Sequence, residues 1–419
     1  MNKMILSALS VISFSLSLVA CGSSGSSTAV PEAVTAGDEY SFEKNDAELS
    51  AGFKTAASDF SAELLKKVCA EDIAAGKNAL VSPESVMLSL GLAANGAGGQ
   101  TLKEFETLLG GDTETFNSDL SALMTAASSS EDVKFNIANS IWVREDERIN
   151  INKSYAETCK KRLDAESFLA PFNNGTLDKL NGWVSQKTDG MIDKILEKFA
   201  EDDLAVLINC IAFDAQWLSE YEDNDVKSGI FHPADGSKQI CEMLSSDENI
   251  YLSDGSAEGF MKYYKGGRYA FAAMLPNEGV SLSDYVAGLT GSRLTQLLAG
   301  AQNAQVEVSM PEFKFDYSQD ITDSVKSIGA QSAFTKAADF SNLSDAELYI
   351  SSIVHKTHIG VSREGTKAAA ATEVTLTAKG IIVPDENVKR IVLDRPYLFM
   401  IVDTQTSLPV FIGAVNTVE

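Results

Sequence analysis

Apolar residues recur along the chain in two kinds of pattern, one typical of helices and one of strands. Between Leu49 and Val68 they fall at steps of three and four residues, which predicts an amphipathic helix. Residues 204–213 form a run that is apolar apart from Asn209, and this run predicts a strand buried on both faces. Helical patterns dominate the first half of the chain and strand patterns the second, without an internal repeat. This order indicates an α+β fold.

Capping and turn signals set the limits of further elements. Ser82 followed by Pro83 predicts the start of a helix that runs to about Asn95, because serine caps helices and proline fits their first turn. Residues 177–199 and 281–298 are also predicted to be helical. Extended segments are predicted at residues 78–81, 135–143, 231–243 (a hairpin), 305–315, 349–361, 391–403 and 409–415.

The first 45 residues have the composition of an export signal and a linker. A short basic start precedes an apolar run, and the sequence LVAC at residues 18–21 resembles the bacterial lipoprotein cleavage box. This resemblance implies that residues 1–20 are a lipoprotein signal peptide and that Cys21 carries a lipid; an ordinary secretion signal with a chance cysteine is the alternative. Residues 21–45 are rich in Ser, Gly, Ala and Glu and are predicted to be a flexible tether. We therefore expect an exported protein, anchored in the membrane at the envelope or surface of a bacterial cell, with its folded domain at residues 46–419.

The composition permits one large folded domain and restricts its partners. Of the 419 residues, 44% are hydrophobic, and the formal net charge is −25 at pH 7. So strong a negative charge argues against a nucleic-acid partner, because the phosphates would repel the protein. Beyond the signal run, no other apolar stretch is long enough to predict a transmembrane helix.

Residue types that carry catalysis or bind metals are sparse. The histidines are His232, His355 and His358, and they show no metal-binding or catalytic spacing with cysteines or acidic residues. We therefore expect neither an enzyme nor a metal ion or other cofactor. Four further cysteines are irregularly spaced, and they are either paired, as in many exported proteins, or free in a large core: Cys69, Cys159, Cys210 and Cys241.

Residues 363–380 mix small residues with β-branched ones, in the order REGTKAAAATEVTLTAKG. Four alanines favour a helix, but Gly365 before them and the β-branched residues after them argue against a settled one. From Thr366 onward, one set of alternating positions is uncharged, and Lys367, Glu373 and Lys379 all fall on the other set. The segment is therefore either an ordinary surface loop or a loop that can enter a sheet as a strand.

The sequence EGTKAAAAT at residues 364–372 resembles the hinge of the reactive-centre loop of serpins, where the pattern is EGTEAAAAT. Further blocks resemble the family in the same order: NALVSPESV at 78–86, NGWV at 181–184, LINCIAF at 207–213, ADFS at 338–341 and DRPYLF at 394–399. The resemblance covers about residues 46–417. It implies the serpin fold, in which helices pack around three β-sheets and a reactive-centre loop, here about residues 364–388, is exposed.

The resemblance also implies a function. A serpin is a suicide inhibitor that traps a serine protease as an acyl-enzyme when its cleaved loop inserts into the central sheet. Counting from Gly365 by the family spacing places the reactive bond at Lys379–Gly380. Lysine suits a trypsin-like protease, whereas a shifted register suits an elastase-like or subtilisin-like one. The expected partner is a serine protease in covalent complex with a monomeric inhibitor. The implied hinge consists of Glu364, Gly365, Thr366, Lys367, Ala368, Ala369, Ala370, Ala371 and Thr372.

Two groups of residues correspond to family features of the central sheet. The shutter is a buried polar cluster where the sheet opens, and it consists of Ser82, Ser85, Asn209 and His355. The breach, where the hinge first enters, consists of Trp217, Glu312 and Arg363. At the last two positions the chain departs from the family, in which a glutamate precedes the hinge and a lysine follows the proline of the neighbouring strand. Both charges are reversed, which predicts an Arg363–Glu312 pair.

Two alternatives remain open from the sequence. A serpin that no longer inhibits would keep the fold, although such members often carry bulkier or charged hinge residues in place of the alanines found in this chain. A solute-binding lipoprotein of a transporter would share the signal, the tether, the size and the acidic composition, but not the serpin-like blocks.

Overall fold

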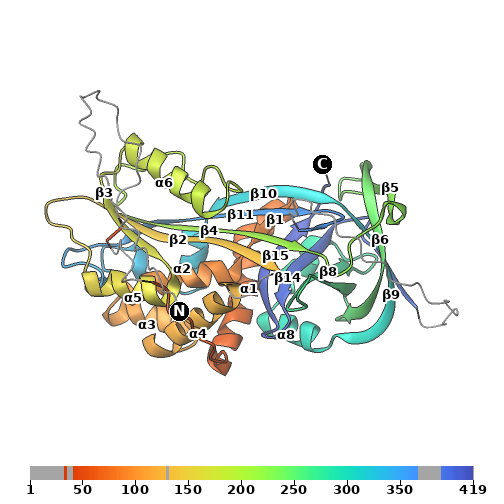
Figure 1. The fold of residues 1–419 in the computed structure, drawn as a ribbon, viewed down its shortest axis with the longest axis horizontal. Helices are drawn as coiled ribbons and strands as arrows, with labels where there is room; N and C mark the ends of the chain where they lie inside the picture. The colour runs from red at the N-terminus through yellow and green to blue at the C-terminus, as the bar shows by residue number, and fades with distance from the viewer. Residues whose placement is uncertain (1–32, 35–40, 129–131, 367–387, 419) are drawn as a thin grey trace, which may run out of the picture.

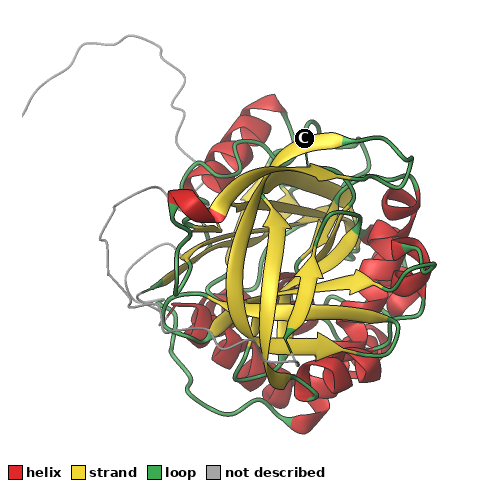
Figure 2. Ribbon diagram, turned by 90° about the vertical axis from the view of Figure 1, so that its right-hand side faces the viewer, coloured by secondary structure: helices red, strands yellow, loops and turns green. Residues whose placement is uncertain are grey.

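The computed structural model describes residues 33–34, 41–128, 132–366 and 388–418. A long twisted sheet runs along much of the molecule, with most helices gathered below one half of it and further strands packed at the other end (Figure 1). After a turn of 90°, those strands face the viewer and helices lie around their rim (Figure 2). The predicted α+β class is therefore confirmed.

The helices of the described residues fall into two groups along the chain. Six precede the strand β4 and three lie between β8 and β11. Their bounds are α1 Ala51–Ala74, α2 Pro83–Gly96, α3 Gly99–Leu109, α4 Thr113–Ser128, α5 Lys153–Leu163, α6 Asn174–Lys187, α7 Leu282–Ala287, α8 Gly291–Ala299 and α9 Thr322–Ile328, with short 3-10 turns at η1 Asp223–Asp225 and η2 Ser332–Phe334.

The long sheet, called the central sheet below, has six strands in the order β10-β11-β12-β4-β2-β3. Strands β11 and β4 run parallel, and β10 and β2 are antiparallel to them on either side. The bounds are β2 Val133–Arg144, β3 Glu166–Ala170, β4 Ala205–Gln216, β10 Phe313–Asp320, β11 Ile350–Val361 and β12 Gly365–Thr366.

The other strands of the described residues form a nine-stranded sheet in the order β1-β15-β14-β8-β7-β6-β9-β13, with β5 also paired to β6. The long strand β6 pairs with β7 near its end and with β9 along most of its length, so it joins two smaller sheets. The three expected sheets are therefore the central sheet and two others that share β6. The bounds are β1 Ala79–Val81, β5 Val226–Phe231, β6 Gln239–Ser253, β7 Ala257–Tyr263, β8 Tyr269–Pro276, β9 Gln302–Pro311, β13 Lys389–Val392, β14 Tyr397–Asp403 and β15 Leu408–Val415.

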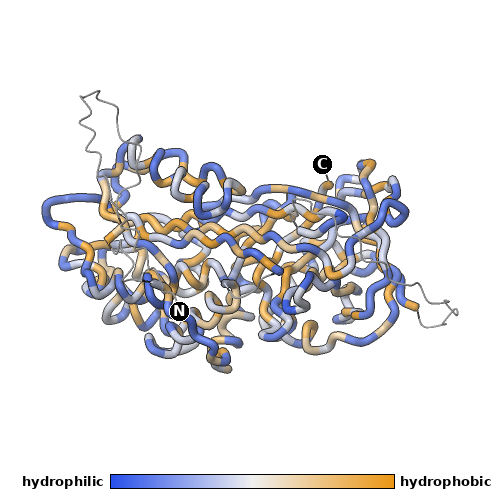
Figure 3. The backbone as a smooth tube through the Cα atoms, viewed as in Figure 1, coloured by the Kyte–Doolittle hydropathy of each residue, from blue (hydrophilic) through white to orange (hydrophobic). Residues whose placement is uncertain are grey.

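Apolar packing holds the central sheet on both faces. Helix α2 lies beneath it with almost every side chain buried, and the apolar strands run through the middle of the molecule (Figure 3). On the opposite face, α6 packs Trp183 edge-on against Trp142 and Phe168, whose rings stack at 4.2 Å. Burial of large aromatic side chains of this kind contributes about 2–3 kcal/mol each.

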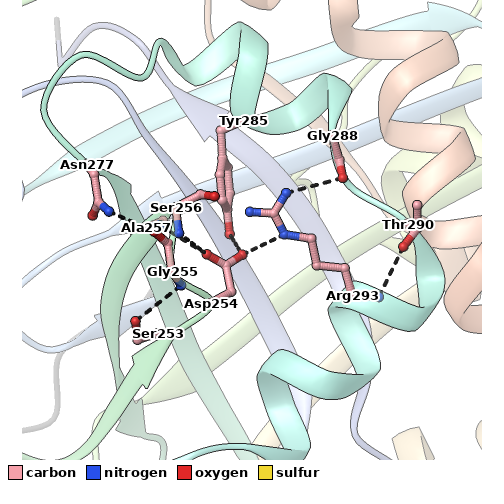
Figure 4. Close-up of polar contacts among 10 residues, drawn as sticks. All are labelled: Ser253, Asp254, Gly255, Ser256, Ala257, Asn277, Tyr285, Gly288, Thr290 and Arg293. Atoms are coloured by element: carbon pink, nitrogen blue, oxygen red, sulfur yellow. Dashed lines mark hydrogen bonds and ion pairs between the residues drawn. The ribbon is translucent and has the colours of Figure 1, made fainter.

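A polar cluster fixes the helices α7 and α8 to the nine-stranded sheet (Figure 4). Asp254, in the turn between β6 and β7, accepts hydrogen bonds from the Tyr285 hydroxyl at 3.0 Å and from Arg293 Nε at 2.8 Å. The guanidinium of Arg293 also donates to the carbonyl of Gly288 at 3.2 Å and lies over the Tyr285 ring. One carboxylate thus connects two helices and a hairpin, which gives this cluster a structural role.

Several predicted elements are confirmed. Ser82 caps α2 by accepting a hydrogen bond from the amide of Ser85, and Pro83 is the first residue of the helix. The predicted buried strand at residues 204–213 is β4, whose first nine residues are all buried. The hairpin turn falls at Asp235 and Gly236, between β5 and β6.

Other predicted elements end earlier or are divided. The helix predicted at residues 177–199 ends at Lys187, because Thr188 Oγ1 accepts a hydrogen bond from the amide of Ile192 and turns the chain. The helix at 281–298 is two helices, α7 and α8. The extended segment at 305–315 is divided at Glu312, where the chain passes from the nine-stranded sheet into the central sheet. The segment at 391–403 is likewise divided into β13 and β14.

The predicted tether stays a prediction, but its described end contacts the domain. The Glu43 amide donates to the carbonyl of Lys161, and Asn45 donates its side-chain amide to Ser118 on α4. The amide of Val34 donates to the carbonyl of Ser167 in β3. Within the described part of the chain, no helix is both long and apolar enough to cross a membrane.

Candidate functional site

The residues after β11 turn back and enter the central sheet. The amide of Ser362 donates to the carbonyl of Gly365 at 2.8 Å, which closes a tight turn. Strand β12 then lies between β11 and β4: Thr366 is opposite Val361 on one side and Ala215 on the other. The beginning of the predicted hinge is thus a short antiparallel strand at the end of the sheet.

Gly365 is required by this geometry. A Cβ atom built at this position would lie 2.1 Å from the carbonyl oxygen of Ala215, far inside van der Waals contact. The backbone of β12 can approach β4 so closely because glycine has no side chain. Thr366, the next residue, is fully buried.

Past the end of β12, the strands β11 and β4 pair directly with each other. They are in parallel register from Ile350 opposite Ala205 to His358 opposite Ala212. We call this parallel pairing the seam. Parallel pairs are slightly less stable per residue than antiparallel ones. An extra strand that continued β12 would have to separate the two strands along this line.

The predicted breach residue Trp217 contacts the hinge directly. Its backbone amide donates to the carbonyl of Glu364 at 2.9 Å, and its indole Nε1 donates to the carbonyl of Ser362 at 2.9 Å. The amide of Tyr221 donates to the carbonyl of Arg363 at 3.1 Å. Trp217 and Tyr221, which follow β4, therefore donate hydrogen bonds to the carbonyls of three consecutive residues of the hinge turn, 362 to 364.

Arg363 and Glu312 meet, although in a different way from the one predicted. Glu312 Oε1 accepts a hydrogen bond from the backbone amide of Arg363 at 2.9 Å. The guanidinium of Arg363 instead pairs with Asp223 at 3.0 Å and with Glu242 at 3.7 Å. Burial raises the pKa of Glu312, and the nearby Glu242 carboxylate raises it further. The reversed charge at 363 is thus matched by several acidic groups and not by Glu312 alone.

The four predicted shutter residues form one buried network across the seam. His355 on β11 donates from Nδ1 to Asn209 Oδ1 on β4 at 2.5 Å, and its Nε2 accepts the amide hydrogen of Ser82 at 3.1 Å. Asn209 Nδ2 donates to the carbonyl and hydroxyl oxygens of Ser85 at 2.7 Å. Burial lowers the pKa of His355 to about 3, so the imidazole is neutral and can accept the Ser82 bond.

Sequence reasoning missed residues that the fold brings to these sites. Asn139 on β2 accepts a hydrogen bond from Asn209 at 2.5 Å, and Tyr264 packs on Trp217 with ring centroids 4.4 Å apart. The second acidic partner of Arg363, Glu242, lies on β6. Each comes from an element that is distant in sequence, so no local pattern marks it.

The remaining predicted residues lie outside the described chain or in the core. Lys367 to Thr372 of the hinge, the bond Lys379–Gly380 and Cys21 belong to the residues that the structure does not describe. Cys69, Cys159 and Cys210 are buried, Cys241 is partly exposed, and all four are free. No group of acidic, histidine and cysteine residues in the described ranges is suited to hold a metal ion.

Comparison with known proteins identifies the family. The model of the family described as "Serpin (serine protease inhibitor)" matches residues 55–418, so the chain belongs to the serpin family. Iripin-5 of Ixodes ricinus is 31% identical over 358 residues, which cover 81% of this chain and 89% of that protein. Serpins are protease inhibitors, although some members do not inhibit, and they are generally not enzymes.

Two solved structures of the thermophilic serpin tengpin resemble this one. The native state superposes with a TM-score of 0.83 at 38% identity, covering 91% of this chain and 98% of tengpin. The latent state superposes with a TM-score of 0.76 at 37% identity, covering 89% and 100%. The serpin fold predicted from the sequence blocks is therefore confirmed, and the arrangement is more similar to a native state than to a latent one.

Proposed function

We propose that the protein is a suicide inhibitor of serine proteases. The observation that carries this proposal is the position of β12, which already separates the ends of β11 and β4. A cleaved loop that continues β12 would open the seam and become a strand of the central sheet. Family membership argues against the alternative of a solute-binding lipoprotein.

The proposed reaction begins as ordinary proteolysis. The protease serine attacks the carbonyl carbon of Lys379, the bond to Gly380 breaks, and the amine leaves with a proton from the protease. An ester now joins the serine oxygen to Lys379. Insertion of the loop carries the protease away and distorts its site before water can hydrolyse the ester. A lysine at this bond makes a trypsin-like protease the expected target, with an elastase-like or subtilisin-like one if the bond lies elsewhere.

The register of β12 predicts what insertion does to the shutter. Thr366 lies opposite Ala215 and Val361; six residues further along a continued β12, Thr372 would lie opposite Asn209 and His355. It would share the buried face of Thr366, because side chains alternate with a period of two. Insertion therefore breaks the His355–Asn209 hydrogen bond and supplies a threonine hydroxyl at the same level.

The direct test mixes the full chain with trypsin, an elastase and a subtilisin. A complex that survives denaturing electrophoresis, with a released peptide that begins at Gly380, would support the inhibitor and its reactive bond. A complex with a different released peptide would retain the mechanism and correct the bond. Cleavage within the loop by all three proteases without a complex would contradict the proposal and favour a non-inhibitory serpin.

Matched variants separate insertion from binding. Thr366→Arg places a charge at a buried position and is expected to convert the inhibitor into a substrate, whereas Lys367→Arg, on the other set of alternating positions, is expected to trap protease normally. Thr372→Val should impair trapping more than Thr372→Ser, since only the serine keeps a hydroxyl for the opened shutter. Equal trapping by Thr366→Arg and Lys367→Arg would contradict insertion in this register.

Export and anchoring are part of the proposal. The LVAC box at residues 18–21 supports lipidation of Cys21 and a position of the monomeric inhibitor at the envelope or surface of a bacterial cell. Expression in a bacterium with a fatty-acid label should mark the wild type and leave Cys21→Ser unmarked. An unlabelled wild type released into the medium would favour an ordinary secretion signal.

A further inference from the structure

The buried side chain of Thr366 has a specific partner at the end of the central sheet. Its Oγ1 lies 2.6 Å from the hydroxyl of Tyr264, and both residues are fully buried. Because burial raises the pKa of Tyr264, the phenol stays protonated and can donate this hydrogen bond. The position after Gly365 is thus held by a side chain as well as by the strand pairing.

Tyr264 is also fixed by contacts other than the one with Thr366. Its amide donates to the carbonyl of Tyr269 at 3.0 Å, and its backbone bridges to Trp217. Its ring stacks on Trp217 at an angle of 10° and meets the Phe213 ring edge-on at 5.0 Å. The orientation of the phenol is therefore set by these contacts as well as by its bond to Thr366.

Withdrawal of the hinge would leave this phenol without its partner in an apolar environment. A buried hydroxyl without a hydrogen bond is unfavourable, so the bond favours the inserted position of Thr366 over a withdrawn one. Trp217 acts in the same direction, because it stacks on Tyr264 and also donates to the carbonyls of Ser362 and Glu364. The aromatic pair and the hinge form one continuous contact.

We propose that Tyr264 is a positioning residue that holds the hinge in the central sheet through Thr366 and so prepares the loop for insertion. The effect on protease trapping rests on the proposed inhibitory function, whereas the holding of the hinge by Tyr264 does not. After cleavage, insertion competes with hydrolysis of the acyl-enzyme, and a loop whose first residues are already in the sheet starts from a formed nucleus. Loss of the hydroxyl of Tyr264 slows insertion and sends more inhibitor to the cleaved, inactive product.

The first measurement needs no protease target. Hydrogen exchange of the backbone amides at residues 362–366 is compared in the full chain for wild type, Tyr264→Phe and Tyr263→Phe. Tyr263 is the matched control, since it is the neighbouring tyrosine but is partly exposed and lines a cavity that Tyr264 does not reach. Tyr264→Phe is expected to raise exchange at 362–366 about fivefold, equivalent to the ~1 kcal/mol of a typical hydrogen bond, and Tyr263→Phe to leave it unchanged. Equal exchange in all three proteins would overturn the inference.

The second measurement tests the consequence in a protein that traps protease. More than one inhibitor molecule is consumed per trapped protease when some inhibitor is cleaved without trapping. This excess should rise about fivefold in Tyr264→Phe and in Thr366→Val, and it should rise no further in the double variant. Thr366→Ser, which keeps the hydroxyl, should behave as wild type. An unchanged ratio in Tyr264→Phe despite faster exchange would overturn the claim that the held hinge prepares insertion. If no variant traps any protease, the proposed function fails, and the exchange measurement alone decides whether Tyr264 holds the hinge.

Discussion

Acid should weaken the shutter through one side chain, His355. Its pKa falls from 6.5 to about 3 on folding, because burial disfavours the charged imidazolium. Protonation would also place a hydrogen on Nε2, which now accepts the amide hydrogen of Ser82, so a donor would face a donor. The fold therefore excludes the proton that the unfolded chain binds below pH 6.5.

The sign and the size follow from linkage. A histidine whose pKa is lowered by folding contributes its stability in full above pH 6.5, and the contribution is lost as the pH falls from 6.5 toward 3. At pH 5 the unfolded chain is almost fully protonated at this site and the folded chain is not. The loss is then about 2 kcal/mol, and it approaches 4–5 kcal/mol near pH 3.

The assay compares the urea midpoint of the first unfolding transition at pH 7.5 and pH 5 in wild type and in His355→Gln. Glutamine can donate and accept at this site but does not titrate, and all other ionisable groups are common to both proteins. The variant is expected to be less stable at pH 7.5 and to lose about 2 kcal/mol less between the two pH values. The same pH dependence in both proteins would refute the assignment of this loss to His355.

Three further predictions concern the hinge and the amino-terminal contact. Arg363→Glu brings another carboxylate beside Asp223 and should increase polymers on native gels, whereas Arg363→Ala should cost less than about 1 kcal/mol in urea unfolding, since Asp223 is almost fully exposed. Gly365→Ala should displace β12 and abolish protease trapping on denaturing gels, and trapping at the wild-type level would show that this close approach is not needed. Asn45→Ala removes the side-chain bonds to α4 and should lower the free energy of unfolding by about 1–2 kcal/mol, while Asp46→Ala, an exposed neighbour, should not.

The fold and the shutter were predictable because their signals are local or carried by family blocks. Ser82 and Pro83 fix the start of α2, and the apolar run of β4 requires burial on both faces. Once these two elements and β11 are placed, Asn209 and His355 lie opposite each other in register. The hydrogen bond across the seam then follows from two polar side chains that share one buried position.

The contacts of the hinge were not predictable in the same way. Asp223, the partner of Arg363, is 140 positions away in a short 3-10 turn, and nothing in its neighbourhood marks it as a partner. The expected Arg363–Glu312 pair was inferred from exchanged charges, but Glu312 stands where the chain passes between two sheets and binds the backbone of Arg363 instead. Tyr264 required the relative placement of β7, β4 and the hinge turn.

Two contacts of the central sheet bear on the proposed insertion, and they act in different ways. The His355–Asn209 bond crosses the seam itself, so an inserting strand must break it, and weakening it lowers the barrier to any insertion, with or without cleavage. The contact of Tyr264 with Thr366 lies where the strand begins, so strengthening it favours the held hinge over a withdrawn one without opening the seam. Variants of the shutter should therefore change mainly the lifetime of the native state, and variants of Tyr264 mainly the outcome of a cleavage that has already occurred.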